Sequence, residues 1–351
     1  MENNKTPSIR FKGFTDPWEQ RKAKDLCSIS TGKSNTQDRV DDGIYPFYVR
    51  SPIVEHSNRY LFDEEAVLTV GDGVGTGKVF HYVNGKYDLH QRVYRMFDFS
   101  EKITAKYFYY YFSNHFYDRV MAMTAKTSVD SVRYEMIADM DIALPEIQEQ
   151  VAISDCFDNL DNLITLHQRK YNKLLNVKKS MLEKMFPKNG SNIPEIRFKG
   201  FTDPWEQCKF SDVIDIGSGM DYKHLGEGNI PVYGTGGYML SVNKALSYDK
   251  DAIGIGRKGT IDKPYILRAP FWTVDTLFYC IPKEHNNLDF INCIFQNVDW
   301  KKKDESTGVP SLSKVIINNV ETAIPTFDEQ QKIGAYFSEL DNLITLHQRE
   351  F

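Results

Sequence analysis

The chain has 351 residues, of which 41% are hydrophobic and 26% are charged. This length is too great for one ordinary core and fits two domains with a connecting segment, and the composition is that of a globular protein. No apolar run approaches the roughly 18 residues of a membrane-spanning helix, and the first residues lack the apolar stretch of a signal peptide. We therefore expect a soluble protein of the cytoplasm that does not enter a membrane.

The net charge of −5 argues against a free-standing nucleic-acid binder with a basic face. The cysteines are odd in number and never spaced C-x-x-C, which argues against a disulfide framework and against a zinc site. They are Cys27, Cys156, Cys208, Cys280 and Cys293. We expect all of them to be reduced thiols.

Two segments occur twice. IRFKGFTDPWEQ stands at residues 9–20 and again at 196–207, and LDNLITLHQR stands at 160–169 and again at 340–349. Chance does not supply both identities, so the chain is a tandem duplication.

The stretches between these repeats, residues 21–143 and 208–323, share a pattern but little identity. We interpret the repeated flanks as a scaffold and the divergent middle parts as two different readers. If the duplication had a purely structural role, there would be no reason for the flanks alone to keep nearly identical sequences.

A glycine-rich loop, GDGVGTGKV, covers residues 71–79. It fails the Walker A pattern, because Asp72 stands where a glycine is needed and Val79 where Ser or Thr is needed. It fails the dinucleotide-binding pattern as well. Its counterpart in the second half is IGIGRKGT at 253–260. Two interpretations stay open for both loops: a β-hairpin tip, or a loop whose backbone and cations approach DNA phosphate or a guanine edge.

An aromatic stretch, YFYYYFSNHFY at 107–117, aligns with DFINCIFQNVDW at 289–300. Spacings of three and four recur in both, which favours an amphipathic core helix over a platform for base stacking. Basic residues follow in each half, at 119–126 and 300–303. We expect these to be loop-like, and either solvated or in contact with phosphate.

The segment from Pro145 to Phe186 carries the clearest helical pattern in the chain. Its apolar residues recur in steps of four and three, as coiled-coil packing requires, and about 40 residues at ~1.5 Å each make a rod of about 60 Å. Acidic residues gather at its start and basic residues at its end, in accord with the helix dipole. The second copy of this pattern begins at Asp328.

We expect the two helices to pair antiparallel, because this sets the acidic start of the second beside the basic end of the first. The alternative is that each helix packs on its own domain. The residues expected to pair are Ile153, Phe157, Leu160, Ile164 and Leu174 in the first helix, and Ile333, Phe337, Leu340 and Ile344 in the second.

We expect the second helix to be less than half as long as the first. Antiparallel pairing therefore leaves Ile153, Phe157 and Leu160 without a partner in the same chain, as an exposed apolar stripe. Our hypothesis is that another chain covers this stripe, for example through self-association of the shortened helix region.

Nothing in the sequence indicates catalysis or metal binding. There is no H-E-x-x-H motif, no metal-type pairing of histidines and no G-x-S-x-G motif. The repeated His167 and His347 fall on the coiled-coil seam, where packing is their expected role.

With its two divergent readers, repeated flanks and two helices, the sequence resembles the specificity subunit of type I restriction-modification systems. The resemblance covers essentially the whole chain. It rests on FKGFTDPWEQ opening each half, IGRKGT and PFWTVDTLF inside the second half, GVPSLSK at 308–314, and LPEIQEQVAI and LDNLITLHQR at the helices.

The resemblance implies a mixed α/β fold with two tandem α+β target-recognition domains, separated by long helices that pair as an antiparallel coiled coil. The domains would be residues 1–144 and 191–324, with helical regions at 145–190 and 325–351. Family members usually have a second helix that returns the full distance, so the short one here departs from the pattern.

The resemblance also implies that each domain reads one half of a split site in double-stranded DNA. Two modification subunits would methylate adenine N6 with S-adenosylmethionine, and restriction subunits would use ATP and Mg²⁺. This chain would hold no cofactor, and it lacks the S/N/D-P-P-Y/F motif of an adenine methyltransferase. Partner subunits would complete a positive channel, which answers the objection from the net charge.

We expect cations on loops to make the DNA contacts. The candidates are Arg50, Lys78, Arg92 and Lys126 in the first domain, and Arg257, Lys258, Lys301 and Lys314 in the second. The rival hypothesis is a DNA-free adaptor that binds two identical partners through the repeated flanks. A nuclease is disfavoured, because no carboxylate cluster repeats in both halves.

Overall fold

Each copy of the repeated segment IRFKGFTDPWEQ leads into a short strand that pairs with the strand just before a long helix. In the first half β1 (Glu19–Lys22) runs antiparallel to β8 (Asp141–Leu144). In the second half β9 (Glu206–Lys209) runs antiparallel to β17 (Glu321–Ile324). The repeated flanks thus bring the two ends of each divergent stretch together, which is a scaffold role.

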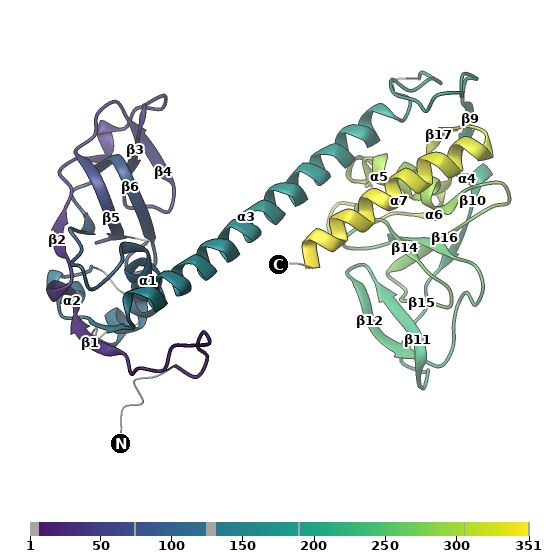
Figure 1. The fold of residues 1–351 in the computed structure, drawn as a ribbon. Coiled ribbons are helices and arrows are strands. Elements are labelled where there is room, and N and C mark those ends of the chain that lie inside the picture. The colour runs from purple at the N-terminus through teal and green to yellow at the C-terminus, as the bar shows by residue number, and fades with distance from the viewer. Residues whose placement is uncertain (1–6, 74, 124–130, 189, 305, 350–351) are drawn as a thin grey trace. The chain divides into compact units, whose positions relative to one another are not determined.

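The structure is a computed structural model. It describes residues 7–73, 75–123, 131–188, 190–304 and 306–349. The chain divides into two units, the first ending at Leu163 and the second beginning at Ile164 (Figure 1).

The boundary between the units lies inside helix α3 (Ile147–Lys184). We expected residues 145–190 and 325–351 to be helical regions apart from the two domains. Instead, the start of α3 belongs to the first unit, where Glu149, Gln150 and Ser154 are buried. The rest of α3 belongs to the second unit.

The first unit is built on a six-stranded sheet in the order β2-β7-β5-β6-β3-β4. All neighbouring strands are antiparallel except β3 and β6, which are parallel. The strands are β2 (Ser28–Thr31), β3 (Tyr45–Tyr48), β4 (Val54–Ser57), β5 (Phe62–Val70), β6 (Phe80–Leu89) and β7 (Val93–Phe97). The helices are the short 3-10 turns η1 (Ala23–Asp25) and η2 (Thr36–Asp38), then α1 (Ala105–Ala122) and α2 (Tyr134–Ala138).

Helix α1 is the aromatic segment, and it packs as a core helix as expected. Thr104 caps it by accepting a hydrogen bond from Tyr107 N. Its buried stripe repeats every four residues at Phe108, Phe112 and Phe116, with ring centroids 5.3 and 4.3 Å apart. The expectation of a basic loop from residue 119 was wrong in part, because Arg119 lies in the last turn of α1. Its Nε donates to the carbonyl of Met136 at 2.8 Å.

The second unit carries a four-stranded antiparallel sheet, β10-β16-β13-β14, and a three-stranded sheet, β12-β11-β15. Its strands are β10 (Ile214–Ser218), β11 (Glu227–Gly234), β12 (Gly237–Val242), β13 (Ala252–Gly256), β14 (Tyr265–Leu267), β15 (Trp272–Thr273) and β16 (Leu277–Pro282). Its helices are α4 (Phe210–Val213), α5 (Leu288–Asn297), η3 (Trp300–Lys303), α6 (Lys314–Asn318) and α7 (Phe327–Arg349). The lysines at 301–303 therefore form a 3-10 turn, not a loop.

In the second unit, α7 packs beside the later part of α3, and the two helices run antiparallel (Figure 1). The expectation that the second helix is less than half as long as the first was wrong, because α7 has 23 residues and α3 has 38. His167 of α3 contacts His347 of α7, with the two Nδ1 atoms 3.2 Å apart. Just beyond the end of α3, the ring of Phe186 lies 6.1 Å from that of Phe337. The partner positions on α7 thus run backwards as α3 advances, and the expected antiparallel pairing is confirmed.

The residues expected to pair fall into three groups. Ile333, Phe337, Leu340 and Ile344 are buried, and Leu174 packs against this cluster. Ile153 packs instead on the core of the first unit. Phe157, Leu160 and Ile164 are about half exposed, although the Phe157 ring contacts that of Tyr110 at 5.1 Å. Among the helices described, none is both long and apolar enough to cross a membrane.

Candidate nucleic-acid interface

Both glycine-rich loops are the connections of β-hairpins. Residues 71–79 join β5 to β6, and residues 257–264 join β13 to β14. The backbone N–H of Gly71 donates to the carbonyl of Arg92 at 2.8 Å, and that of Arg257 donates to the carbonyl of Thr276 at 2.8 Å. Gly71 and Arg257 therefore occupy equivalent positions in the two units.

A second contact repeats on the far side of each loop. Val132 N donates to the carbonyl of Gly71 at 2.7 Å, and Leu312 N donates to the carbonyl of Arg257 at 2.9 Å. Asp72 forms an antiparallel bridge with Ser131, just as Lys258 does with Ser311. These backbone contacts are thus the same in both units, whereas the side chain at this bridge is a carboxylate in one and an ammonium group in the other.

The loop of the second unit borders an open cavity of about 850 Å³. Three of the cations expected to contact DNA line it: Arg257, Lys258 and Lys314. Five hydroxyl side chains share the lining, those of Ser218, Ser306, Thr307, Ser311 and Ser313. None of the described residues in the lining is a carboxylate, so the cavity carries positive charge and hydroxyl groups together.

Asp304 holds the part of the wall that contains Ser306 and Ser311. Its Oδ1 accepts hydrogen bonds from the backbone N–H groups of Ser306 and Ser311, at 2.9 and 3.0 Å. These bonds hold the pKa of Asp304 below its usual range. Gly259 N donates to the carbonyl of Pro310 at 2.8 Å and ties this wall to the glycine loop.

Lys314 reaches the cavity from the first turn of α6, where Ser313 caps the helix by accepting from Ile316 N. Its Nζ donates to the carbonyl of Ile216 at 3.0 Å. Arg257 is exposed, and its guanidinium donates to the carbonyl of Asp275 at 3.4 Å. A surface whose described lining residues supply cations and hydroxyls suits DNA phosphate oxygens or the acceptor edge of guanine.

Lys301 lies outside this cavity. Its Nζ pairs with Asp262 at 2.8 Å, and this contact lowers the pKa of the Asp262 carboxyl. The structure therefore brings together three of the four cations that the sequence suggested in the second unit.

In the first unit, Arg50 and Arg92 converge on the carboxylate of Asp72, with nitrogen to oxygen distances of 3.2 and 3.6 Å. Lys78 stands apart from them, with its Nζ 4.6 Å from the centroid of the Tyr117 ring. Lys126 lies outside the described residues. The first unit thus brings two of the four expected cations together.

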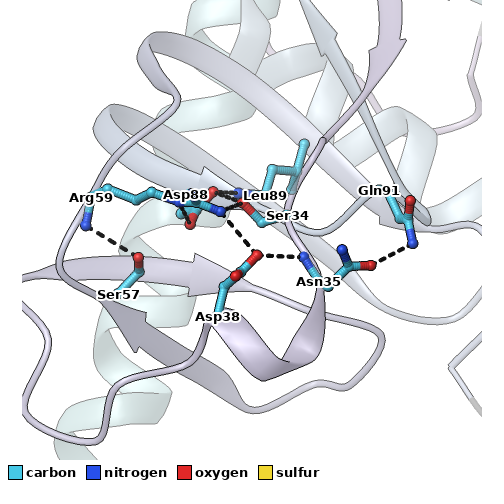
Figure 2. Close-up of polar contacts among 8 residues, drawn as sticks. All are labelled: Ser34, Asn35, Asp38, Ser57, Arg59, Asp88, Leu89 and Gln91. Carbon is cyan, nitrogen blue, oxygen red and sulfur yellow. Dashed lines mark hydrogen bonds and ion pairs between the residues drawn. The ribbon is translucent and has the colours of Figure 1, made fainter.

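Beside Arg50 and Arg92 lies a polar network that sequence reasoning missed (Figure 2). It joins Ser34, Asn35, Asp38, Arg59, Asp88 and Gln91. These residues come from three separate segments, 34–38, 59 and 88–91, and no spacing along the chain links them. The one hint of this network in the sequence was Asp88, a carboxylate that stands between Tyr87 and Leu89 at the end of β6.

Among the residues that the structure describes, no group of three or more His, Cys, Asp or Glu side chains is placed to hold a metal ion. Two carboxylates are deeply buried at the repeated flanks, but each is satisfied by arginine. Glu149 accepts from Nε and Nη2 of Arg10 at 2.6 and 2.7 Å, and Glu329 accepts from Nε and Nη2 of Arg197 at 2.7 Å each. These bidentate pairs are structural and occur at equivalent positions.

Known proteins share both the sequence and the fold. A 386-position alignment with the type I restriction enzyme MjaVIII specificity subunit of Methanocaldococcus jannaschii is 22% identical, covering 95% of this chain and 88% of that protein. The EcoDI specificity subunit of Escherichia coli is also 22% identical, over 90% of this chain and 79% of its own length.

The crystal structure of the type I restriction-modification system S subunit from M. genitalium superposes with a TM-score of 0.76 at 15% identity. It covers 98% of this chain and 94% of that one. A structure described as the basis of complex assembly and conformational transition of the type I R-M system superposes with a TM-score of 0.52 at 13% identity. These likenesses confirm the expected fold of mixed α/β type.

The model of the type I restriction modification DNA specificity domain matches residues 15–176 and 202–350, one copy in each half. Proteins of this kind recognise a DNA target and act with partner subunits, in which the catalysis lies. The two matches follow the duplication seen in the sequence and in the two units. The chain therefore belongs to the type I restriction-modification DNA specificity family, as a non-catalytic specificity subunit.

Proposed function

We propose that the chain reads a split DNA target, with one unit for each half-site, and directs partner subunits to methylate adenine or to restrict the DNA. The observation that carries this proposal is the repeated loop scaffold with different side chains at equivalent positions. Arg257 and Lys258 in the second unit stand where Gly71 and Asp72 stand in the first. Equivalent loop positions that carry different side chains in the two units fit two different half-sites.

The partners would be two modification subunits, one for each repeated flank. The Arg10–Glu149 and Arg197–Glu329 pairs hold the two flanks on their helices in the same way, so the chain offers two like surfaces. S-adenosylmethionine would be held by the modification subunits, and ATP with Mg²⁺ by restriction subunits.

The half-exposed side chains of α3 add a second expected contact. Phe157 and Leu160 are 46% and 47% exposed, and Leu163 next to them on the same helix is 51% exposed. We propose that another protein chain covers them, either a partner subunit or a second copy. Sedimentation of the purified chain would show mass rising with concentration if a second copy does so.

The test is to express the chain with its cognate modification subunit and to map N6-methyladenine across plasmid DNA by single-molecule sequencing. We expect a split motif with a fixed gap, which would name both half-sites. A palindromic motif would contradict the one-unit-per-half-site proposal. It would mean that two copies of the chain form a dimer, in which the same unit of each copy reads one half-site.

The adaptor hypothesis makes a different prediction for the same experiment. A purified complex that forms but leaves DNA unmethylated would favour an adaptor that reads no DNA. The control is the same modification subunit with another specificity chain, which must methylate its own motif.

A further inference from the structure

The polar network of the first unit is centred on a buried carboxylate (Figure 2). Asp88 is 0% exposed, and its Oδ1 accepts hydrogen bonds from Ser34 Oγ at 2.6 Å and from Leu89 N at 2.8 Å. Its Oδ2 lies 3.6 Å from Nε of Arg59. Burying a carboxylate costs free energy unless it is paired, so this position calls for a reason beyond packing.

The second unit shows that the scaffold itself does not need this carboxylate. In the parallel pair of the first unit, Phe47 lies opposite Asp88, and in that of the second unit Val232 lies opposite Trp272. Trp272 is buried in an apolar cluster with Val232 and Val242. The same place in the fold is thus apolar in one unit and charged in the other, so the network belongs to what the first unit reads.

The network leads outward from Asp88 to an exposed turn. Arg59 donates Nη2 to Asp38 Oδ2 at 2.9 Å, and this same oxygen accepts from Asn35 N at 2.8 Å. Asn35 Oδ1 in turn accepts from Gln91 Nε2 at 2.6 Å. The exposed amide of Gln91 is therefore oriented by a chain of contacts that begins at a buried charge.

The backbone fixes the same turn. Gln91 N donates to the carbonyl of Ser34 at 2.9 Å, and Arg92 N donates to Nδ1 of the buried His90 at 3.0 Å. Among the described residues, none provides a hydrogen-bond partner for Gln91 Oε1 or for Asn35 Nδ2. An acceptor and donors therefore stand ready at a rigid, exposed edge.

The charges around this edge balance. The arginines Arg50, Arg59 and Arg92 are each paired with a carboxylate of Asp38, Asp72 or Asp88. A balanced cluster attracts phosphate weakly, whereas an oriented amide matches a base edge. Asn and Gln amides form paired hydrogen bonds with N6 and N7 of adenine in the major groove.

We propose that Gln91, held by Asn35, reads an adenine in the half-site of the first unit, and that Asp88 and Arg59 are positioning residues for it. The proposal rests on the proposed function, since it names the base contact that one unit makes. Gln91→Ala should relax the preference for A·T at one base pair of one half-site by about tenfold. Gln91→Glu should shift that preference towards cytosine, because a carboxylate accepts from cytosine N4.

The experiment selects DNA from a library with both half-sites randomised, using the full chain in complex with its modification subunit. Bound DNA is sequenced for the wild type, both Gln91 variants and Gln296→Ala, a partly exposed glutamine on α5, outside the repeated flanks and the cavity, whose replacement should leave both half-sites unchanged. A shifted preference in Gln91→Glu cannot arise from misfolding.

The two failures are distinguishable. A wild type that selects no split motif would overturn the proposed function together with this inference. A wild type that selects a split motif, with an unchanged motif in both Gln91 variants, would overturn this inference alone. Asp88→Asn should relax the same base pair as Gln91→Ala, and relaxation elsewhere would remove Asp88 from the positioning role.

Discussion

Arg257 is the residue for which a role in the second half-site is most directly testable. It opens the glycine loop, it is exposed, and it lines the cavity with Lys258 and Lys314. We expect Arg257→Ala to relax base preference in one half-site, at a cost of about 1–3 kcal/mol of discrimination, and to leave the other unchanged. Methylation mapping of the variant measures this. Lys301→Ala is the matched control, because Lys301 pairs with Asp262 outside the cavity.

We expect His90 to make the first unit sensitive to acid. Burial lowers its pKa, and the charges of Arg50 and Arg92 lower it further, although Asp72 opposes them. A depressed folded-state pKa means that the stabilisation is complete above the ordinary value of about 6.5 and is lost as pH falls through the lowered one. We expect the unfolding midpoint to fall between neutral pH and about pH 5.

His90→Gln is the comparison for this prediction, since an amide oxygen can accept from Arg92 N without titrating. The acid-dependent loss should be smaller in this variant when thermal melts are compared across the same pH series. Equal losses in both proteins would assign the effect to other groups, such as the partly buried His81, whose pKa is also lowered by burial.

At the scale of the helical elements, one decapeptide occupies two environments. Leu160 on α3 is 47% exposed, and Leu340, the same residue of the repeat on α7, is 8% exposed. Leu340→Ala should lower the free energy of unfolding by about 2–5 kcal/mol, because it removes buried apolar contacts and leaves a cavity. Leu160→Ala should change it by about 0.5 kcal/mol or less. Denaturant titrations compare them directly, and similar losses for both would contradict the packing described.

The same two helices show what helical periodicity can predict and what it cannot. The pattern predicted that α3 and α7 exist and pair antiparallel, because a seam with steps of three and four is a local property of the sequence. It did not place Ile153, which packs on the first unit instead of in the helix pair. That outcome depends on strands and helices far away along the chain.

At the scale of the whole molecule, α3 is the one helix that belongs to both units. If it sets the gap between half-sites, inserting a heptad between Leu163 and Ile164 should lengthen the gap by up to about 3 base pairs, since seven residues add about 10.5 Å of helix. A heptad keeps the apolar seam on the same face. Methylation mapping would show the gap, and an unchanged gap would refute the ruler.

The sequence by itself determined the duplication, the repeated flanks, the helices and the family, because identity and periodicity are written along the chain. It also marked Arg257, Lys258 and Lys314, which the structure brings to one cavity. Only the tertiary structure decided which copy of LDNLITLHQR is buried, since ten identical residues meet different neighbours. Only the tertiary structure joined Asp88 to Gln91, because hydrogen bonds between separate segments depend on how the strands pair and leave no spacing to read.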